Sequence, residues 1–341
     1  MKYLPLGGTL MSQTAISHHA GKIVTPKKKF TREDFKKGLS KGKYVYIMFL
    51  PVFIYYIIFC YLPMYGIVIA FQDFRPGMGF FEGARWVGFT HFKNFFSSPI
   101  AFKVIKNTIV LNLWELVLGF PAPIIFALLL NEIKGNRFKR TVQTISYLPH
   151  FVAMVVVIGI VKDIVSSEGL INTVLYNLQE WLGKNPDNFQ PILFLNQSKY
   201  FRPIYVLSGI WQGIGWGSIL YLSNLASIDP GLYEAAEIDG AGRFRKMFAI
   251  TIPGIAPTIT IMLIFAVGGL MSGGFEKLIL LYQPLTYDVA DTLGTYMYRI
   301  GLEEAKYSLS AAVSLFGTII NFALLVAVNK FAAVVSENSL W

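Results

Sequence analysis

The chain has 341 residues, a formal net charge of +10 at pH 7 and a mean hydropathy of +0.51. Hydrophobic residues make up 54% of it and charged residues only 15%, whereas soluble domains carry about 25% charged residues. This shortage of charge predicts a membrane protein. A single cysteine excludes an internal disulfide, and with only 4 histidines we expect no metal site.

Six long apolar runs follow one another along the chain. Crossing about 30 Å of hydrocarbon takes about 20 apolar residues in a helix. The runs are continuous rather than alternating, which favours helices over the strands of a membrane barrel. The predicted fold is therefore all-α and integral to the membrane. The six expected transmembrane helices lie at residues 44–71, 107–130, 146–165, 204–225, 254–272 and 309–331.

The basic residues predict the orientation of these helices. With the N-terminus in the cytoplasm, more than half of all Lys and Arg residues fall on the cytoplasmic side. Both termini are then expected to be cytoplasmic. The chain divides into a basic tail at 1–43, a transmembrane domain at 44–331 and a short C-terminal tail at 332–341. Basic residues before a first span serve orientation and attraction to anionic lipid, so we expect no nucleic-acid partner.

The sequence between the fourth and fifth apolar runs, at residues 229–253, predicts a projecting elbow on the cytoplasmic side. Asp229 can cap a helix that starts at Pro230, and Gly240 can end it, so we expect a short helix, a break and a second short helix. Phe244 and Phe248 are four residues apart and are expected to anchor the second helix beneath the membrane spans. A capped helical hairpin without further function is an alternative interpretation.

The spacing within the elbow resembles the EAA loop of binding-protein-dependent ABC importer permeases. Six residues match its pattern in register, with Ile252 where the family usually has Leu: Glu234, Ala235, Ala236, Gly240, Ile250 and Pro253. Further stretches resemble the LplB/YteP-like subgroup of carbohydrate permeases. They are Pro63-Met-Tyr-Gly66, Trp86-Val-Gly88, Leu148-Pro-His-Phe151, Asp239-Gly-Ala241 and Gly274-Phe-Glu-Lys277.

The resemblance implies a permease subunit of an ATP-driven importer in the plasma membrane of a Gram-positive bacterium. The implied substrates are oligosaccharides, with pectin-derived rhamnogalacturonan or galacturonan fragments expected. The implied partners are a second permease, two ATPase subunits and an extracellular substrate-binding lipoprotein. The residues expected to couple to the ATPase are Glu234, Ala235, Ala236, Asp239, Gly240, Ala241, Ile250 and Pro253.

The chain carries no Walker A loop of its own. Its Gly-Lys pairs begin at Gly21, Gly42 and Gly183, and none is followed by Ser or Thr. We therefore expect this chain to be a transport subunit rather than an enzyme and to bind no cofactor. ATP and Mg are expected to be used by the partner ATPase.

A sugar path is expected among a few polar and aromatic residues of the spans. Glu115 is the only acid deep in a span, and it either contacts sugar hydroxyls or fixes helix packing through a polar partner. Lys162 and Lys330 lie near span ends, so we expect the partner permease to supply basic groups. The other candidates for the path are Trp211, Gln212, Trp216 and Asn321.

Two other classes of protein remain as alternatives. An ion-coupled secondary sugar carrier would be expected to hold several ionisable groups at mid-membrane and to show inverted repeats. A membrane enzyme acting on lipid-linked sugar would need paired carboxylates near an interface. Two acidic pairs are available, Asp288 with Asp291 and Glu303 with Glu304, but they are expected instead to form an outer surface that contacts a binding protein.

Overall fold

The computed structural model describes residues 42–78, 83–183, 185 and 188–336. Most of the predicted basic tail and the end of the C-terminal tail lie outside these residues. The chain forms two compact units, Met1–Pro63 and Met64–Trp341. The first unit contains helix α2 (Lys43–Tyr56) and the wider, π-helical turn η1 (Ile57–Tyr61), which together form most of the expected first span.

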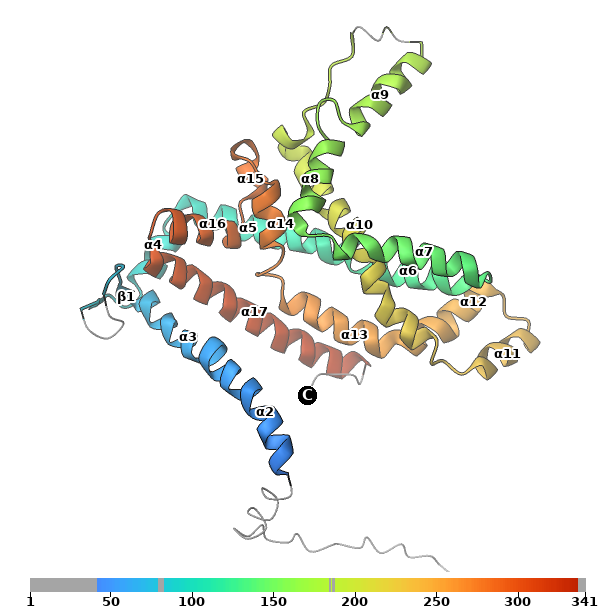
Figure 1. Ribbon diagram of the computed structural model, residues 1–341, viewed down its shortest axis with the longest axis horizontal. Coiled ribbons are helices and arrows are strands. Elements are labelled where there is room, and N and C mark those ends of the chain that lie inside the picture. The colour runs from blue at the N-terminus through green and yellow to red at the C-terminus, as the bar shows by residue number, and fades with distance from the viewer. Residues whose placement is uncertain (1–41, 79–82, 184, 186–187, 337–341) are drawn as a thin grey trace, which may run out of the picture. The chain divides into compact units, whose positions relative to one another are not determined.

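The second unit is a set of helices joined by short connections (Figure 1). Helix α3 (Leu62–Met64) leads into it, and two short strands, β1 (Gln72–Asp73) and β2 (Arg85–Trp86), pair antiparallel. Its principal helices are α4 (Thr90–Phe96), α5 (Pro99–Trp114), α6 (Pro121–Glu132), α7 (Asn136–Tyr147), α8 (Met154–Ile164), α9 (Leu170–Trp181), α10 (Ser198–Leu225), α11 (Pro230–Ile238), α12 (Arg243–Lys246), α13 (Ile252–Gly268), α14 (Phe275–Leu281), α15 (Tyr287–Ala290), α16 (Leu293–Tyr298) and α17 (Tyr307–Ser336).

Shorter segments of tighter or wider helix connect them. The tighter turns are η2 (Tyr65–Phe71), η4 (Leu148–Phe151), η6 (Phe194–Asn196) and η8 (Pro284–Thr286). The wider, π-helical turns are η3 (Glu115–Gly119), η7 (Met247–Thr251) and η9 (Arg299–Glu303).

Among the described residues, four helical segments are long and apolar enough to cross a membrane. They are Lys43–Phe71, Pro99–Glu132, Arg243–Gly268 and Tyr307–Val334. These segments overlap the first, second, fifth and sixth predicted spans. Helix α10 coincides with the fourth, and its 28 residues would reach about 42 Å, but its many Gly, Ser and Tyr residues lower its hydropathy. The helical architecture is confirmed, and the count of six spans stays a prediction.

The third predicted span, at 146–165, is not one straight helix. Asn136–Phe151 and Met154–Ile164 are bent by 105° against each other. The backbone becomes extended after Phe151, at Val152, and Pro149 supplies no N–H to a continuous helix. The apolar residues before and after this break therefore belong to two helices, and the pair is either a broken span or a re-entrant loop.

Three of the π-helical turns end two residues before a proline. In η1, η3 and η7 the N–H of the following residue bonds to the carbonyl five residues earlier: Leu62 to Ile57, Phe120 to Glu115 and Ile252 to Met247. Pro63, Pro121 and Pro253 come next in each case. A proline ring clashes with the carbonyl four residues before it, and a wider turn moves that carbonyl away. The prolines therefore determine where these helices widen.

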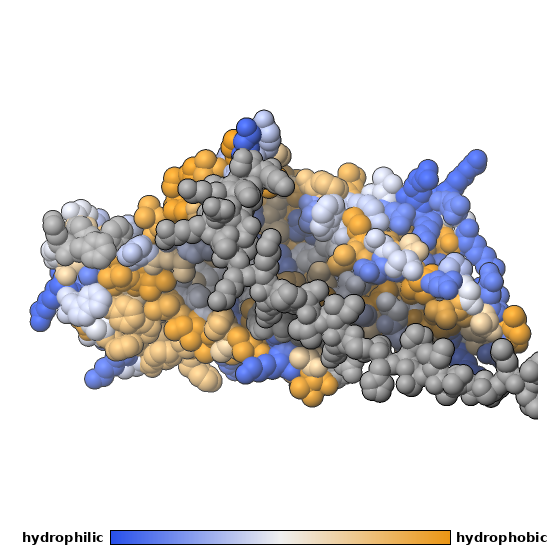
Figure 2. All heavy atoms as spheres, turned by 90° about the horizontal axis from the view of Figure 1, so that it is seen from below, coloured by the Kyte–Doolittle hydropathy of each residue, from blue (hydrophilic) through white to orange (hydrophobic). Residues whose placement is uncertain are grey.

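Helix α10 lies at the centre of the second unit, where it packs against α6, α7 and α13. Gly215 permits the closest approach, because a side chain there would collide with the backbone carbonyl of Ser146. Helices α13 and α17 lie side by side (Figure 1). Figure 2 shows apolar residues over much of the visible face and hydrophilic residues gathered toward its right-hand end.

Candidate functional site

The elbow at 229–253 folds as a capped helix followed by a sharp turn. The Asp229 side chain accepts a hydrogen bond from the Gly231 N–H at 2.9 Å, and Pro230 is the first helical residue of α11. The helix ends at Ile238, and Gly240 has φ +71°, a left-handed conformation that glycine adopts without strain. The predicted helix, break and second helix are confirmed, except that α12 continues through η7 into α13.

The residues expected to couple to an ATPase lie on this elbow. Glu234, Ala235, Asp239, Gly240 and Pro253 are exposed. The remaining three, Ala236, Ala241 and Ile250, are half-buried. The structure therefore presents a carboxylate and a small side chain next to each other on the outer face of α11.

Three large apolar side chains of the elbow are also exposed. Ile238 is 87% exposed, Phe244 76% and Phe248 65%. The prediction that Phe244 and Phe248 anchor the second helix beneath the spans is therefore wrong. Their helical spacing does place them on one face, but both side chains are mostly exposed, so that face does not pack against the described part of the chain. Exposed aromatic residues in such a group are typical of an interaction surface.

Two polar contacts hold α11 against α12 and η7 within the elbow. The Tyr233 hydroxyl lies 3.1 Å from Thr251 Oγ1, and Lys246 Nζ donates to Glu237 Oε1 at 2.5 Å. This hydrogen bond and the charge of Lys246 lower the pKa of Glu237 below its ordinary value. A cavity of about 300 Å³ between these residues is also lined by Glu132, Lys134 and Arg243.

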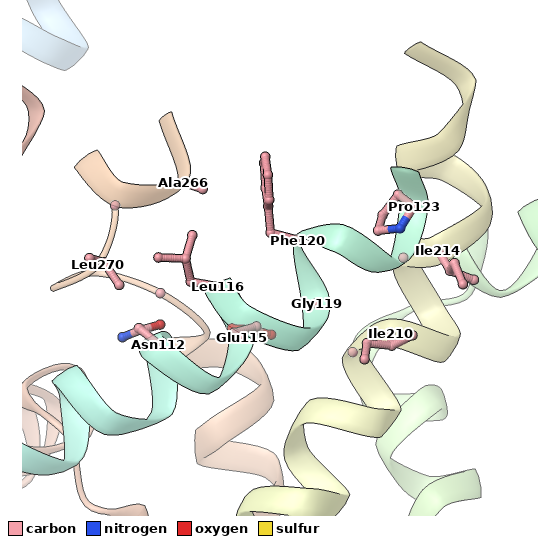
Figure 3. A pocket seen from close by; sticks show the side chains of 14 residues that line it. Asn112, Glu115, Leu116, Gly119, Phe120, Pro123, Ile210, Ile214, Ala266 and Leu270 are labelled. Carbon is pink, nitrogen blue, oxygen red and sulfur yellow. The ribbon is translucent and has the colours of Figure 1, made fainter. Parts of the chain in front are cut away.

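A second candidate site surrounds Glu115, inside the helical unit. Glu115 lines a cavity of about 340 Å³ between η3, α10 and the end of α13 (Figure 3). Asn112 and Leu116 lie beside it on the same chain segment, while Ile210 and Ile214 enter from α10 (Figure 3). Glu115 therefore borders a mostly apolar space, and its charge needs a partner.

That partner is Lys277, which sequence reasoning did not identify. Lys277 Nζ donates to Glu115 Oε1 at 3.0 Å, and only 6% of the Lys277 side chain is exposed. This chain therefore places a basic group of its own beside the cavity, and the expectation that basic groups of a sugar path come from another permease stays a prediction. The sequence did offer a signal for this pair. It has one lysine directly before the apolar run Leu278–Leu281 and one acid deep in a span.

Gln212 lines a neighbouring cavity of about 460 Å³ together with Glu115, Lys277 and His150. Trp216 stacks on the His150 ring, with centroids 4.5 Å apart and planes 4° from parallel. Trp211 is 45% exposed and lines neither cavity. Glu115 and Gln212 therefore line the same cavity, and Trp216 contacts it only through His150. Trp211 lines neither cavity.

Asn321 also lies apart from these cavities. Its Oδ1 accepts from the Met271 N–H at 2.8 Å, and its Nδ2 donates to Ser272 Oγ at 2.5 Å. Both ends of the amide are thus used to tie α17 to the turn after α13.

The acidic pairs do not share one environment. Asp291 is 5% exposed, accepts from Arg299 and Thr295, and so is not part of an outer surface as predicted. Asp288 is exposed and accepts from Ser198 Oγ. In the described part of the chain, no group of three His, Cys, Asp or Glu residues could hold a metal ion.

Several apolar helices, a projecting elbow with an exposed apolar rim, and a charged pair beside cavities define a membrane transport subunit. The chain belongs to the family described as binding-protein-dependent transport system inner membrane component, whose profile matches residues 119–337. It is therefore a permease component of a multi-pass membrane transporter.

Two relatives from Bacillus subtilis (strain 168) are each 40% identical to the chain. Protein LplB aligns over 89% of this chain and 93% of its own length, and the polygalacturonan/rhamnogalacturonan transport system permease protein YteP over 92% and 95%. A crystal structure of a bacterial alginate ABC transporter, in complex with an alginate pentasaccharide-bound periplasmic protein, contains a similar chain. That match has a TM-score of 0.80 at 37% identity and covers 89% of this chain and 99% of the other.

Proposed function

We propose that this chain is the permease subunit of an ATP-driven importer for oligosaccharides, specifically pectin-derived rhamnogalacturonan or galacturonan fragments. One relative is a permease for polygalacturonan and rhamnogalacturonan, and a solved relative belongs to an alginate transporter. Pectin fragments and alginate both carry uronate groups. Fragments of acidic polysaccharides are therefore the class of sugar that these likenesses support.

The observation that carries the proposal is the exposed elbow. Glu234 and Ala235 are exposed on α11, and three apolar side chains of the same elbow, Ile238, Phe244 and Phe248, are exposed as well. A hydrophobic surface with one carboxylate suits docking to a partner protein with a basic group. In the proposal, Glu234 pairs with the ATPase, Ala235 and Ala236 pack in its groove, and Asp239, Gly240 and Ala241 form the bend. Ile250 and Pro253 join the elbow to α13.

The complete transporter would contain two permeases, two ATPase subunits and an extracellular lipoprotein that delivers the sugar. ATP and Mg are used by the ATPase subunits, whose nucleotide cycle moves the permease between two packings. In the proposal, six spans with α10 as the fourth keep both termini on one side of the membrane, and the basic residues favour the cytoplasm of the bacterial cell as that side. Both tails, at 1–43 and 332–341, are then cytoplasmic.

The sugar would pass the cavities beside Glu115 and Gln212. Trp216 on α10 would contribute through its stacking on His150, whereas Trp211 lies apart from the cavities and Asn321 supports the path only by holding α17. The contact between Glu115 and Lys277 fits the alternative in which Glu115 fixes helix packing, and a charged pair beside the cavity would equally serve a sugar path.

The test is uptake by the complete transporter reconstituted in vesicles with ATP inside. The unmodified protein should accumulate oligogalacturonides only when the ATPase is present and active. Glu234→Lys and Gly240→Pro should reduce uptake by at least about tenfold while the permease remains folded in detergent. Full uptake by both variants would overturn the assignment of the elbow.

The same vesicles separate the rival functions. Uptake driven by a proton or sodium gradient without ATPase would identify a secondary carrier. Product formed from lipid-linked sugar by the purified chain would identify an enzyme.

A further inference from the structure

A buried ion pair joins two helices at the wall of the path. Lys277 lies in the first turn of α14 and Glu115 begins η3, 162 residues apart in sequence, with Nζ and Oε1 3.0 Å apart. The two side chains differ in exposure: 6% of Lys277 and 35% of Glu115. The carboxylate is therefore the accessible member of the pair, and the ammonium lies behind it.

Three features of the fold hold the ammonium in place. Lys277 Nζ stands 3.6 Å from the centroid of the Tyr205 ring, which is itself fully buried. Gly209 leaves the space that the pair occupies, because a Cβ there would lie 2.5 Å from Nζ and 3.1 Å from Glu115 Oε1. An ammonium group has three N–H donors, of which Glu115 accepts one. Glu115 and the Tyr205 ring thus hold Lys277 in place, and its amino group has further N–H donors to offer.

The pair stands between the two cavities. Glu115 and Gly209 line both the cavity of about 340 Å³ and the one of about 460 Å³, and Lys277 lines the second. The second cavity also carries Gln212 and His150, whose polar atoms suit sugar hydroxyls. Glu115 and Lys277 both lie at the wall of this second cavity, and Glu115 is the more exposed of the two.

We propose that Lys277 selects acidic sugars: a uronate carboxylate of the passing oligosaccharide replaces Glu115 as the partner of Lys277. This inference rests on the proposed function and names the residue that sets its substrate class. A buried ammonium needs an anion beside it, so only a ligand that brings its own carboxylate can release Glu115 without a large cost. Glu115, about a third exposed, then turns its carboxylate toward the polar side chains of Gln212 and His150 in the second cavity. A neutral sugar leaves the pair closed.

The experiment compares two ligands that differ only in charge. Trigalacturonate and its carboxyl-reduced, neutral counterpart are offered to the reconstituted complete transporter, and KM and kcat for ATP-driven uptake are measured. Lys277→Gln should raise KM for the acidic trimer by roughly 10- to 100-fold, the effect of losing a charge-assisted hydrogen bond, and change the neutral trimer less than about threefold. Lys277→Arg should retain the preference for the acidic trimer.

Further variants separate selection from packing. Glu115→Gln removes the competing carboxylate and should lower KM for the acidic trimer severalfold. Lys277→Gln combined with Glu115→Gln leaves no buried unpaired charge, so it should fold, and it should lose the preference for acid. Lys162→Gln, on α8 and outside both cavities, is the matched control and should change nothing.

Each outcome decides one question. If the double variant keeps the acidic preference, or if Lys277→Gln impairs both trimers equally, the inference is overturned and the pair serves packing alone. An unmodified transporter that imports both trimers equally well also overturns the inference but leaves the importer function intact. Import of neither trimer overturns the proposed function itself.

Discussion

Asp291 and Arg299 form a two-point ion pair: Nη1 donates to Oδ1 at 3.2 Å and Nη2 donates to Oδ2 at 2.6 Å. The carboxylate also accepts from Thr295 Oγ1 at 2.8 Å. Its neighbour Asp288, three residues earlier, is exposed. The same residue type therefore has two different environments within one turn of chain.

Asp291→Asn should destabilise the protein by about 2 kcal/mol, because it leaves the half-buried Arg299 guanidinium without its anion. Asp288→Asn is the control and should cost less than about 0.5 kcal/mol. Thermal unfolding in detergent measures both. Equal shifts in Tm for the two variants would contradict a structural role for Asp291.

Gly209→Ala should destabilise the helical unit by about 1–3 kcal/mol, because the new Cβ meets Lys277 Nζ at 2.5 Å and forces the ion pair apart. At Gly213, one turn later on α10, an added methyl group would have no neighbouring atom within 4 Å, so Gly213→Ala should be tolerated. The comparison uses thermal unfolding of both variants in the same detergent. A Gly213→Ala variant as unstable as Gly209→Ala would show that helix flexibility, not the pair, is affected.

Gly240→Ala should strain the bend of the elbow by about 1–2 kcal/mol, since its φ of +71° disfavours any side chain. An added methyl group would meet no atom within 4 Å at either Gly240 or Gly242, so crowding does not distinguish them. Gly242 has φ −70°, and Gly242→Ala is the control. We expect weaker binding of the ATPase subunit to the Gly240 variant alone, measured by co-purification and by uptake.

The contact between Glu237 and Lys246 should loosen only in acid. Because Lys246 lowers the pKa of Glu237, the contribution of the pair to stability is fully present above the ordinary value of 4.5 and is lost as the pH falls through the lowered value. Amide hydrogen exchange in α11, corrected for its intrinsic dependence on pH, should therefore be unchanged from about pH 7 to pH 5 and faster below. The same experiment on Glu237→Gln should show no such acid-dependent step.

Local patterns sufficed for much of the helical architecture. Asp229 and Pro230 start α11 and Gly240 ends the turn because capping, ring geometry and φ are properties of one or two residues. The long apolar runs likewise became helices. The break after Phe151 was missed because the run continues in composition across it, while the backbone does not.

The charged partners could not be predicted, because they depend on contacts between distant segments. Glu115 and Lys277 meet across 162 positions, and Asp291 is buried by Thr295 and Arg299 rather than by its own hydropathy. For Phe244 and Phe248, helical spacing identified one face but could not tell whether it points inward or toward a partner. Helical periodicity shows which residues share a face of a helix. Only the packing of the other helices shows whether that face is buried or exposed.

The π-helical turn η7 lies at the joint between the elbow and α13, and Pro253 cannot donate to the carbonyl of Ala249. The ladder of backbone hydrogen bonds therefore lacks one bond at Pro253, directly after η7. If the elbow receives the movement of an ATPase, as proposed, α13 can flex at this proline without unwinding elsewhere.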